Sequence, residues 1–425
     1  MRAGRAARGD AAGQPVKAVT FAAPIPRYLV TAAAGRVSAR LFVGPHACTR
    51  LGETASPDLP GDDWVRVRTR MGGICGSDLG IVTLSASPST SPFSSFPFTP
   101  GHENVGTVAE LGRAVKGWSV GERVIVNPLL SCVPRGISPL CPGCAAGHPS
   151  RCERFTDGHV APGMLIGTTK GLGGSWGEEF VAHQSQLVAV PDRMTDEEAV
   201  LVEPLACSVH AVRANLPADG AKVLVIGSGA IGLMTTAALA ALAPRAELTV
   251  VARHAFQAQQ AERLGAKRTV SGRGDYFEAL ASVSGARLLK PVIGKRIAVG
   301  GFDVTYVCVG GARGMEDALR FTRSGGTIVL LGNSTRMDGI DWSPVWLKEL
   351  TIRGSLCYGH GDAHGHAHGG ASTHAFAEAA AMVADGRAAV GPLLTHTFRL
   401  DQLREALLTA MDKKGSGSVK VAFKY

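Results

Sequence analysis

Residues 222–232 read KVLVIGSGAIG, and this stretch decides the fold of the chain. Four of the five residues from Val223 to Gly227 are large and apolar, which is typical of a strand buried on both faces of a parallel sheet. The strand leads into the motif G-x-G-x-x-G, formed by Gly227, Gly229 and Gly232. In a dinucleotide-binding motif the first glycine makes a tight turn, the second admits the pyrophosphate, and the third lets helix and strand touch.

The sequence around the glycines distinguishes a binding motif from a simple turn. An Ala- and Leu-rich helix is predicted over Ala230–Leu242, and a second strand over Glu247–Ala252 completes a βαβ unit. Phosphates would bind the free N–H groups at the start of that helix. The predicted cofactor-binding residues of this unit are Gly227, Gly229, Ala230, Ile231 and Gly232.

Two later apolar segments, Phe302–Gly310 and Gly326–Gly332, predict further parallel strands that end in glycine. Ligands of doubly wound sheets bind beyond the carboxyl ends of the strands. Gly310 and Gly332 are therefore candidate backbone contacts on the nicotinamide side. Residues 272–298 are less regular, and the sequence assigns them no role.

The end of the second strand bears on the choice between NADP and NAD. NAD enzymes carry an Asp or Glu about twenty residues past the glycine motif, where it binds the ribose hydroxyls. Here that position is Ala252, and Arg253 follows it. A guanidinium offers a planar fork of donors to a 2′-phosphate, which favours NADP over NAD. The alternative is that Arg253 lies over the adenine or faces solvent, which would permit either cofactor.

Length and composition set the broad class of protein. The chain has 425 residues, 45% hydrophobic and 19% charged, which favours a globular protein of two domains. Its formal charge of +9 is scattered, without a basic run or nucleic-acid motif, and no apolar run is long enough for a membrane span. The first fifteen residues lack the apolar region of a secretion signal. We therefore expect a cytoplasmic protein with a small-molecule substrate and no nucleic-acid or membrane partner.

The front of the chain holds a set of candidate metal ligands. Short apolar runs between residues 16 and 70 predict a mostly β segment. It is followed by GICGSD, with Cys75 and Ser77, and then by GHE, with His102 and Glu103. A thiolate, an imidazole and a carboxylate can hold zinc and leave its fourth position open.

A second group of cysteines follows. Eight, two and seven residues separate its members, and four thiolates close a tetrahedral zinc site. The predicted ligands are Cys132, Cys141, Cys144 and Cys152. The alternatives are a three-cysteine remnant without metal, or free buried thiols.

With GICGSD and GHE ahead of a dinucleotide motif, the chain resembles the zinc-dependent medium-chain dehydrogenase/reductase family from about Lys17 to its end. The resemblance implies that Cys75 and His102 bind catalytic zinc and that Ser77 begins a proton relay. The family often extends that relay with a His, but this chain has Gly80 there, so the proton must leave by water or another group.

The segment Glu203-Pro204-Leu205-Ala206 resembles the EPLA motif of the polyol, sugar and threonine dehydrogenase branch. In that branch the Glu approaches the catalytic zinc directly or through water. The third ligand is therefore either Glu103 or Glu203. The four-cysteine lobe, at about residues 130–153, matches the family's structural zinc site apart from the insertion VPRGISPL after Cys132.

The resemblance implies an α/β chain in which a mostly β, GroES-like catalytic domain is interrupted by a doubly wound Rossmann domain. The expected boundaries are 1–205 and 357–425 for the catalytic domain and 206–356 for the Rossmann domain, with the active site between them. The family forms dimers and tetramers, so we expect a homodimer or homotetramer.

The predicted function is reversible, zinc-dependent hydride transfer between a secondary alcohol, of the polyol, sugar or amino-alcohol type, and NAD(P). One alternative is a zinc-free enoyl or quinone reductase on the same scaffold. Another is a protein that is not an enzyme and stores metal or senses redox state. The tract 360–374 holds His360, His364, His366 and His368, and it is either a metal-binding tract or a Gly/His loop with no fixed role.

Overall fold

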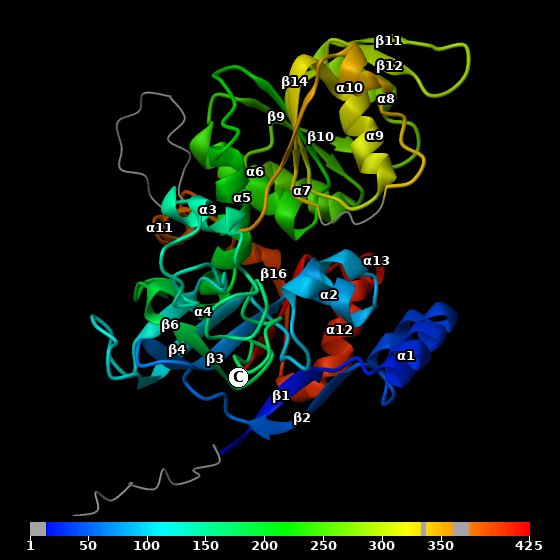
Figure 1. The fold of residues 1–425 in the computed structure, drawn as a ribbon. Helices are drawn as coiled ribbons and strands as arrows, with labels where there is room; N and C mark the ends of the chain where they lie inside the picture. The colour runs from blue at the N-terminus through cyan, green and yellow to red at the C-terminus, as the bar shows by residue number, and fades with distance from the viewer. Residues whose placement is uncertain (1–13, 333–336, 360–373) are drawn as a thin grey trace, which may run out of the picture.

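The computed structural model describes residues 14–332, 337–359 and 374–425. It contains a six-stranded parallel sheet and a seven-stranded sheet, which occupy the upper and lower halves of Figure 1. The predicted His-rich tract lies outside the described residues except for His374, the N-cap of α11. No helix in the described ranges is both long enough and apolar enough to span a membrane.

The parallel sheet has the strand order β10-β9-β8-β13-β14-β15. Its strands are β8 (Lys222–Ile226), β9 (Glu247–Ala252), β10 (Arg268–Ser271), β13 (Phe302–Val307), β14 (Thr322–Leu330) and β15 (Thr351–Gly354). The helices of this half are α5 (Val202–Arg213), α6 (Ala230–Leu242), α7 (Ala255–Arg263), α8 (Phe277–Ser284), α9 (Ala312–Phe321) and α10 (Ser343–Leu347). The order places β8 beside β13, where a doubly wound sheet binds its ligand.

Residues of β8 divide between the two faces of the sheet. Val223 and Val225 belong to the apolar cluster that includes α6 and α7, whereas Leu224 and Ile226 belong to the cluster that includes α8 and α9. Helices therefore cover both faces, and every apolar residue of the strand is buried. The predicted doubly wound fold is confirmed.

The turn after β8 requires glycine. Gly227 has a φ of +104°, which other residues rarely adopt. A Cβ on Gly232 would lie 1.8 Å from the carbonyl oxygen of Gly227. The third glycine of the motif therefore lets α6 start in direct contact with the turn.

The seven-stranded sheet combines segments from both ends of the chain. It consists of β3 (Trp64–Ile74), β4 (Asn104–Leu111), β5 (Arg123–Val126), β6 (Glu179–His183), β7 (Leu187–Ala189), β16 (Leu394–Phe398) and β17 (Lys420–Lys424). Strand β17 pairs with β3, so the C-terminal segment returns to the first part of the chain. In Figure 1 the red C-terminal elements accordingly lie among the blue ones.

Smaller elements surround this sheet. The strands β1 (Pro15–Phe21) and β2 (Thr49–Ala55) form an antiparallel pair. The α-helices are α1 (Ile25–Val37), α2 (Gly76–Val82), α3 (Pro142–Ala145), α4 (Asp196–Ala199), α11 (Ala375–Ala384), α12 (Leu403–Met411) and α13 (Lys413–Ser416). The short 3₁₀ turns are η1 (Ala39–Val43), η2 (Pro88–Phe93), η3 (Pro149–Arg151), η4 (Gln184–Gln186), η5 (Gly391–Leu393) and η6 (Leu400–Gln402).

One apolar cluster joins the two sheets. It contains Ile125 of β5, Val209 of α5 and Val223 of β8, all fully buried. Because α5 packs against both α6 and α11, this helix links the parallel sheet to the C-terminal segment. This link positions the predicted cofactor-binding edge of the parallel sheet relative to the predicted metal-ligand motifs of the seven-stranded sheet.

The prediction of a mostly β segment over residues 16–70 was wrong in its middle. Two of the short apolar runs behind that prediction, RYLVT (residues 27–31) and RVSARLFV (residues 36–43), lie in the helix α1 and the 3₁₀ turn η1. Pro26 stands in the first turn of α1, and Ala32–Ala34 follow, so the segment is rich in residues that favour a helix. A short apolar run fits both the helical and the strand period of apolar residues, so it did not distinguish a helix from a strand.

Two further segments differ from a simple reading of the sequence. The unassigned residues 272–298 contain α8 and most of an antiparallel strand pair, β11 (Arg287–Leu289) with β12 (Ile297–Val299). Residues 196–214, whose sequence pattern is helical throughout, form two helices, α4 and α5, in place of one. Pro204 lies in the first turn of α5, where a missing N–H costs no hydrogen bond, so the division accommodates it.

Candidate active site and metal centres

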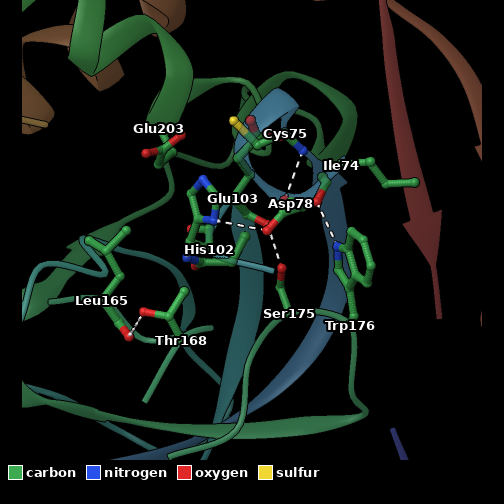
Figure 2. Close-up of polar contacts among 12 residues, drawn as sticks. Ile74, Cys75, Asp78, His102, Glu103, Leu165, Thr168, Ser175, Trp176 and Glu203 are labelled. Carbon is green, nitrogen blue, oxygen red and sulfur yellow. Dashed lines mark hydrogen bonds and ion pairs between the residues drawn. The ribbon is translucent and has the colours of Figure 1, made fainter. Parts of the chain in front are cut away.

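The motifs GICGSD and GHE meet because β3 and β4 are antiparallel neighbours. Cys75 follows the end of β3, and His102 and Glu103 precede the start of β4. The amide of Gly73 donates to the carbonyl of Glu103 at 2.9 Å, which extends the pairing to the motifs themselves. One ligand atom from each of Cys75, His102 and Glu103 lies within 4.8 Å of the others. Figure 2 shows these side chains converging.

Asp78 is a site residue that the sequence analysis did not identify. Its carboxylate accepts a hydrogen bond from the Cys75 amide at 2.9 Å, and its Oδ1 lies 3.3 Å from Nδ1 of His102 (Figure 2). Burial acts to lower the pKa of His102, but Asp78 and Cys75 outweigh it and raise that pKa well above its usual value. Asp78 therefore faces the Nδ1 side of the ring, the position of an outer partner that orients a metal-binding histidine. The available signal was an acidic residue three positions after the cysteine, at N3 of α2.

Lys420 is the second missed residue, and it comes from β17. Its buried ammonium forms an ion pair with Oε1 of Glu103 and donates to the carbonyl of Ile74 at 3.3 Å. Burial acts to lower the pKa of Lys420, but Glu103 and Cys75 raise it above its ordinary value. Lys420 and Glu103 are more than three hundred residues apart in the sequence, so no local motif indicates that they form a pair.

Glu103 retains one oxygen for a cation. Its Oε2 is buried and has no hydrogen-bond partner among the residues that the structure describes, while Oε1 is held by Lys420. A Cβ on Gly73 would lie 2.0 Å from that Oε2, so only glycine fits beside the carboxylate. A free buried carboxylate oxygen next to a thiol and an imidazole is a donor set that suits zinc.

Glu203 lies near this group but outside the set of mutually close ligand atoms. It stands in the first turn of α5, is 4% exposed, and accepts a hydrogen bond from the hydroxyl of Tyr358 at 2.6 Å. Burial raises its pKa, and Glu103 raises it further, whereas His102 lowers it. Figure 2 shows its side chain approaching the Cys75 and His102 group from α5.

Ser77 lies two residues past Cys75, in the first turn of α2, and is partly buried. Gly80 lies in the same helix, where the absent side chain leaves no relay group. His210, on α5, is buried.

The structure brings the four cysteines of the second group together. The sulfurs of Cys132 and Cys152 are 3.7 Å apart, those of Cys141 and Cys152 are 3.9 Å apart, and all four ligand atoms lie within 4.8 Å of one another. The insertion after Cys132 turns back on itself, because Ile137 donates to the carbonyl of Cys132. Four sulfurs at such spacing suit a tetrahedral zinc ion.

Arg135, within that insertion, holds the lobe in place. Its buried guanidinium donates to carbonyls on both sides of the lobe, and burial lowers its pKa. The acceptors are the carbonyls of Leu130, Asp157, Val160, Ala161 and Gly163. These hydrogen bonds hold the insertion in place, so Cys132 joins the other three cysteines in spite of its longer spacing. The sequence analysis did not identify Arg135.

Backbone donors favour a thiolate in the lobe. Burial acts to raise the pKa of Cys141, but hydrogen bonds from the backbone of Glu153 and Cys144 lower it to about 6. Burial instead raises the pKa of Cys152 to about 11. Close sulfurs cannot all be charged without a cation between them, which is the condition a zinc ion would meet.

The predicted cofactor residues lie along one edge of the parallel sheet. Gly227, Gly229, Ala230, Ile231 and Gly232 form the turn after β8 and the start of α6. Gly310 and Gly332 follow β13 and β14, the neighbouring strands. Among the described residues, a Cβ on Gly229 would come within 4 Å only of the ammonium of Lys413, at 3.6 Å. The space next to this glycine is therefore open to a pyrophosphate.

Arg253 directly follows β9 and is exposed. It lines a cavity of about 440 Å³ together with His254, Arg273 and Lys414. Arg273 follows the next strand, β10, so its position at the same sheet edge was an available signal. Lys414 belongs to the C-terminal segment and gave no such signal.

Comparisons with known proteins agree with these features. Residues 61–192 match the family model for the alcohol dehydrogenase GroES-like domain, and residues 230–368 match the one for zinc-binding dehydrogenase. D-arabinitol dehydrogenase 1 of Uromyces fabae is 28% identical over 85% of this chain and 90% of that protein. Sorbitol dehydrogenase of Homo sapiens is 28% identical over 84% of this chain and 88% of that protein.

Solved structures extend the agreement to the fold. The crystal structure of 2R,3R-butanediol dehydrogenase from Bacillus subtilis has a TM-score of 0.67 and 25% identity, over 89% of this chain and 96% of that one. These relatives do not favour the zinc-free reductase or the metal-storage alternative. The chain belongs to the zinc-dependent medium-chain dehydrogenase/reductase family and is an NAD(P)-dependent oxidoreductase.

Proposed function

We propose that this enzyme oxidises a secondary alcohol group of a polyol or sugar, reversibly, with NADP. The observation that carries the proposal is the position of Lys413. Its ammonium lies 3.6 Å from the Cβ position of Gly229, in the cofactor motif, and Lys420, on the same C-terminal segment, forms an ion pair with Glu103 of the metal group. The candidate metal group therefore faces the cofactor edge, as hydride transfer requires.

Cys75, His102 and Glu103 are the proposed ligands of the catalytic zinc, because their donor atoms converge and Glu103 has an oxygen to spare. A zinc ion here supplies Lewis acidity that lowers the pKa of the bound alcohol. Asp78 orients His102, and Lys420 neutralises the remaining charge of Glu103. Ser77 would accept the alcohol proton and pass it to water, since Gly80 offers no further relay.

Glu203 has a different proposed role. Tyr358 already holds one of its oxygens, and its carboxylate is not among the mutually close ligand atoms. We assign it to contact with a substrate hydroxyl, directly or through water, beside the proposed metal group. This role suits a polyhydroxylated substrate, and the arabinitol and sorbitol dehydrogenases to which the chain is similar act on such compounds by name.

The four-cysteine lobe is the proposed structural zinc site. All four sulfurs are used in the group, which leaves no open position for substrate. The lobe therefore contributes folding energy and not chemistry.

The proposed cofactor site follows the carboxyl edge of the parallel sheet. The nicotinamide supplies the hydride acceptor. The turn at Gly227–Gly232 would hold the pyrophosphate, and Gly310 and Gly332 would contact the nicotinamide half. Arg253, without an acidic neighbour at the end of β9, supports NADP over NAD.

An edge of the parallel sheet supports a homodimer. Within the described part of the chain, strand β15 has only β14 as a neighbour in the sheet, and exposed apolar residues precede β15. They are Trp342, Trp346 and Leu347. An exposed strand edge beside large apolar side chains is a typical interface, so we propose pairing of two chains there. Light scattering would show a dimer, or a tetramer built from it.

The proposed domains remain 1–205 with 357–425, and 206–356. A cytoplasmic location also stays a prediction, since it rests on the need for reduced thiols at both metal groups.

A panel of polyols and sugars, assayed with NADP and with NAD, tests the proposed function. We expect turnover of one or more polyols with NADP, and about two zinc ions per chain by elemental analysis. Turnover of enoyl or quinone substrates without zinc would contradict the proposal.

A further inference from the structure

We infer that Lys414 binds the 2′-phosphate of NADP together with Arg253 and Arg273, so that this phosphate is held from both sides of the cleft between the two sheets. The inference rests on the proposed use of NADP and adds a specificity-determining residue from the C-terminal segment.

The cavity beyond β9 is strongly cationic. Its lining residues are Arg253, His254, Arg273 and Lys414, and an adjoining cavity of about 390 Å³ shares the first three. None of the described residues that line these two cavities is acidic. Three like charges around one small volume repel each other, and a bound anion removes that repulsion. A phosphate dianion has the matching charge and acceptor geometry.

The side chain of Arg273 is already ordered for such a ligand. Arg273 donates from Nε to the carbonyl of Arg253 at 2.8 Å, and its Nη2 lies 3.2 Å from Nδ1 of His254. Burial lowers the pKa of His254, and the charges of Arg273, Arg253 and Lys414 lower it further, which is consistent with their closeness. These hydrogen bonds hold the Arg273 guanidinium at the carboxyl end of β9, which Arg253 directly follows.

Lys414 reaches the same cavity from a firmly anchored segment. The side chain of Asp412 caps α13 by accepting from the amide of Gly415 at 2.9 Å, and Gly417 ends the helix with a φ of +70°. Ser416 donates from its hydroxyl to the carbonyl of Thr409 at 3.0 Å, which ties α13 to α12. Binding by Lys414 therefore needs little further ordering of the backbone.

The adjacent Lys413 points to a different phosphate. Its ammonium lies 3.6 Å from the Cβ position of Gly229, where the pyrophosphate of either cofactor would approach the backbone. Lys413 is partly buried, and burial lowers its pKa. Two neighbouring lysines thus contact two chemically distinct parts of the cofactor, only one of which distinguishes NADP from NAD.

The test measures binding to the zinc-loaded full chain by calorimetry, with NADP, NAD, adenosine 2′,5′-bisphosphate and adenosine 5′-monophosphate as probes. We expect Lys414→Gln to weaken NADP and the bisphosphate on the order of tenfold, while NAD and the monophosphate are unchanged. Lys414→Arg keeps the charge and should retain the preference. Lys413→Gln should weaken NADP and NAD equally.

Lys267→Gln is the matched control, because it removes an exposed charge next to the opposite end of β10. It should leave all four affinities unchanged. If Lys414→Gln keeps the wild-type ratio of NADP to NAD affinity, the inference fails while the proposed cofactor stands. If the wild-type protein prefers NAD, the proposed cofactor fails and the inference with it.

Discussion

Asp78 and His102 form a buried pair in which Oδ1 of the carboxylate lies 3.3 Å from Nδ1 of the ring. The same carboxylate accepts a hydrogen bond from the amide of Cys75, so one side chain orients two proposed zinc ligands. Such partners raise ligand basicity and fix the ring orientation. Loss of the carboxylate should therefore weaken the metal site without removing a ligand.

We expect Asp78→Asn to lower the affinity for the catalytic zinc about 10- to 100-fold, as measured by competition with a chelator. The amide keeps the size of the side chain but not its charge. Asp62→Asn, at an exposed position of the same sheet region, is the control. Equal zinc affinity in Asp78→Asn and wild-type protein would show that the pair does not support the metal.

Lys420→Met should destabilise the metal-free protein by about 3–5 kcal/mol, because it leaves the buried charge of Glu103 without a partner. Urea unfolding measures the change. Lys420→Arg preserves the charge and should cost less. Bound zinc should restore part of the lost stability, since it gives Glu103 a new counter-charge. A Lys420→Met protein as stable as wild type would mean that Glu103 is neutral or rearranges.

Cys144→Ser should reduce the zinc content by about one ion per chain and lower the melting temperature, because the lobe loses one of four ligands. Cys48→Ser changes a buried cysteine outside both metal groups and serves as the control. Unchanged zinc content in Cys144→Ser would identify the lobe cysteines as free thiols.

Alanine substitutions at two glycines of the cofactor motif should have different effects, one on the stability of the fold and the other on cofactor binding. Gly232→Ala should destabilise the protein by about 1–3 kcal/mol, since its Cβ would lie 1.8 Å from a backbone oxygen. Gly229→Ala meets no such clash and has an ordinary φ of −74°, so the fold should tolerate it. Its methyl group would instead occupy the space of the pyrophosphate and weaken both cofactors. Thermal unfolding and dinucleotide titration distinguish the two effects, and a stable Gly232→Ala protein would contradict the packing role.

Local patterns predicted the parallel sheet well. The predicted helix Ala230–Leu242 and strand Glu247–Ala252 coincide with α6 and β9. Their apolar spacing and glycine turn are encoded within about thirty consecutive residues. The same reasoning did not predict the helix α1, because a short apolar run fits either the helical or the strand period.

The candidate site shows the same difference between residues within local motifs and residues brought together by the tertiary fold. Cys75 and His102 could be found because each lies in a short motif, whereas Lys420 joins Glu103 only through the pairing of β17 with β3. Lys414 likewise reaches Arg253 across the cleft. Contacts between distant segments depend on the tertiary fold, and one sequence carries no local signal for them.

The most direct measurement is turnover of a responsive polyol by zinc-loaded wild type and Cys75→Ala, with dinucleotide affinity determined on the same preparations. We expect Cys75→Ala to abolish turnover while the dissociation constant for NADP stays within a few-fold, because the cofactor edge and the metal group are built from different segments. Turnover that persists in Cys75→Ala, or in wild-type protein stripped of zinc, would contradict a zinc-dependent mechanism at this site.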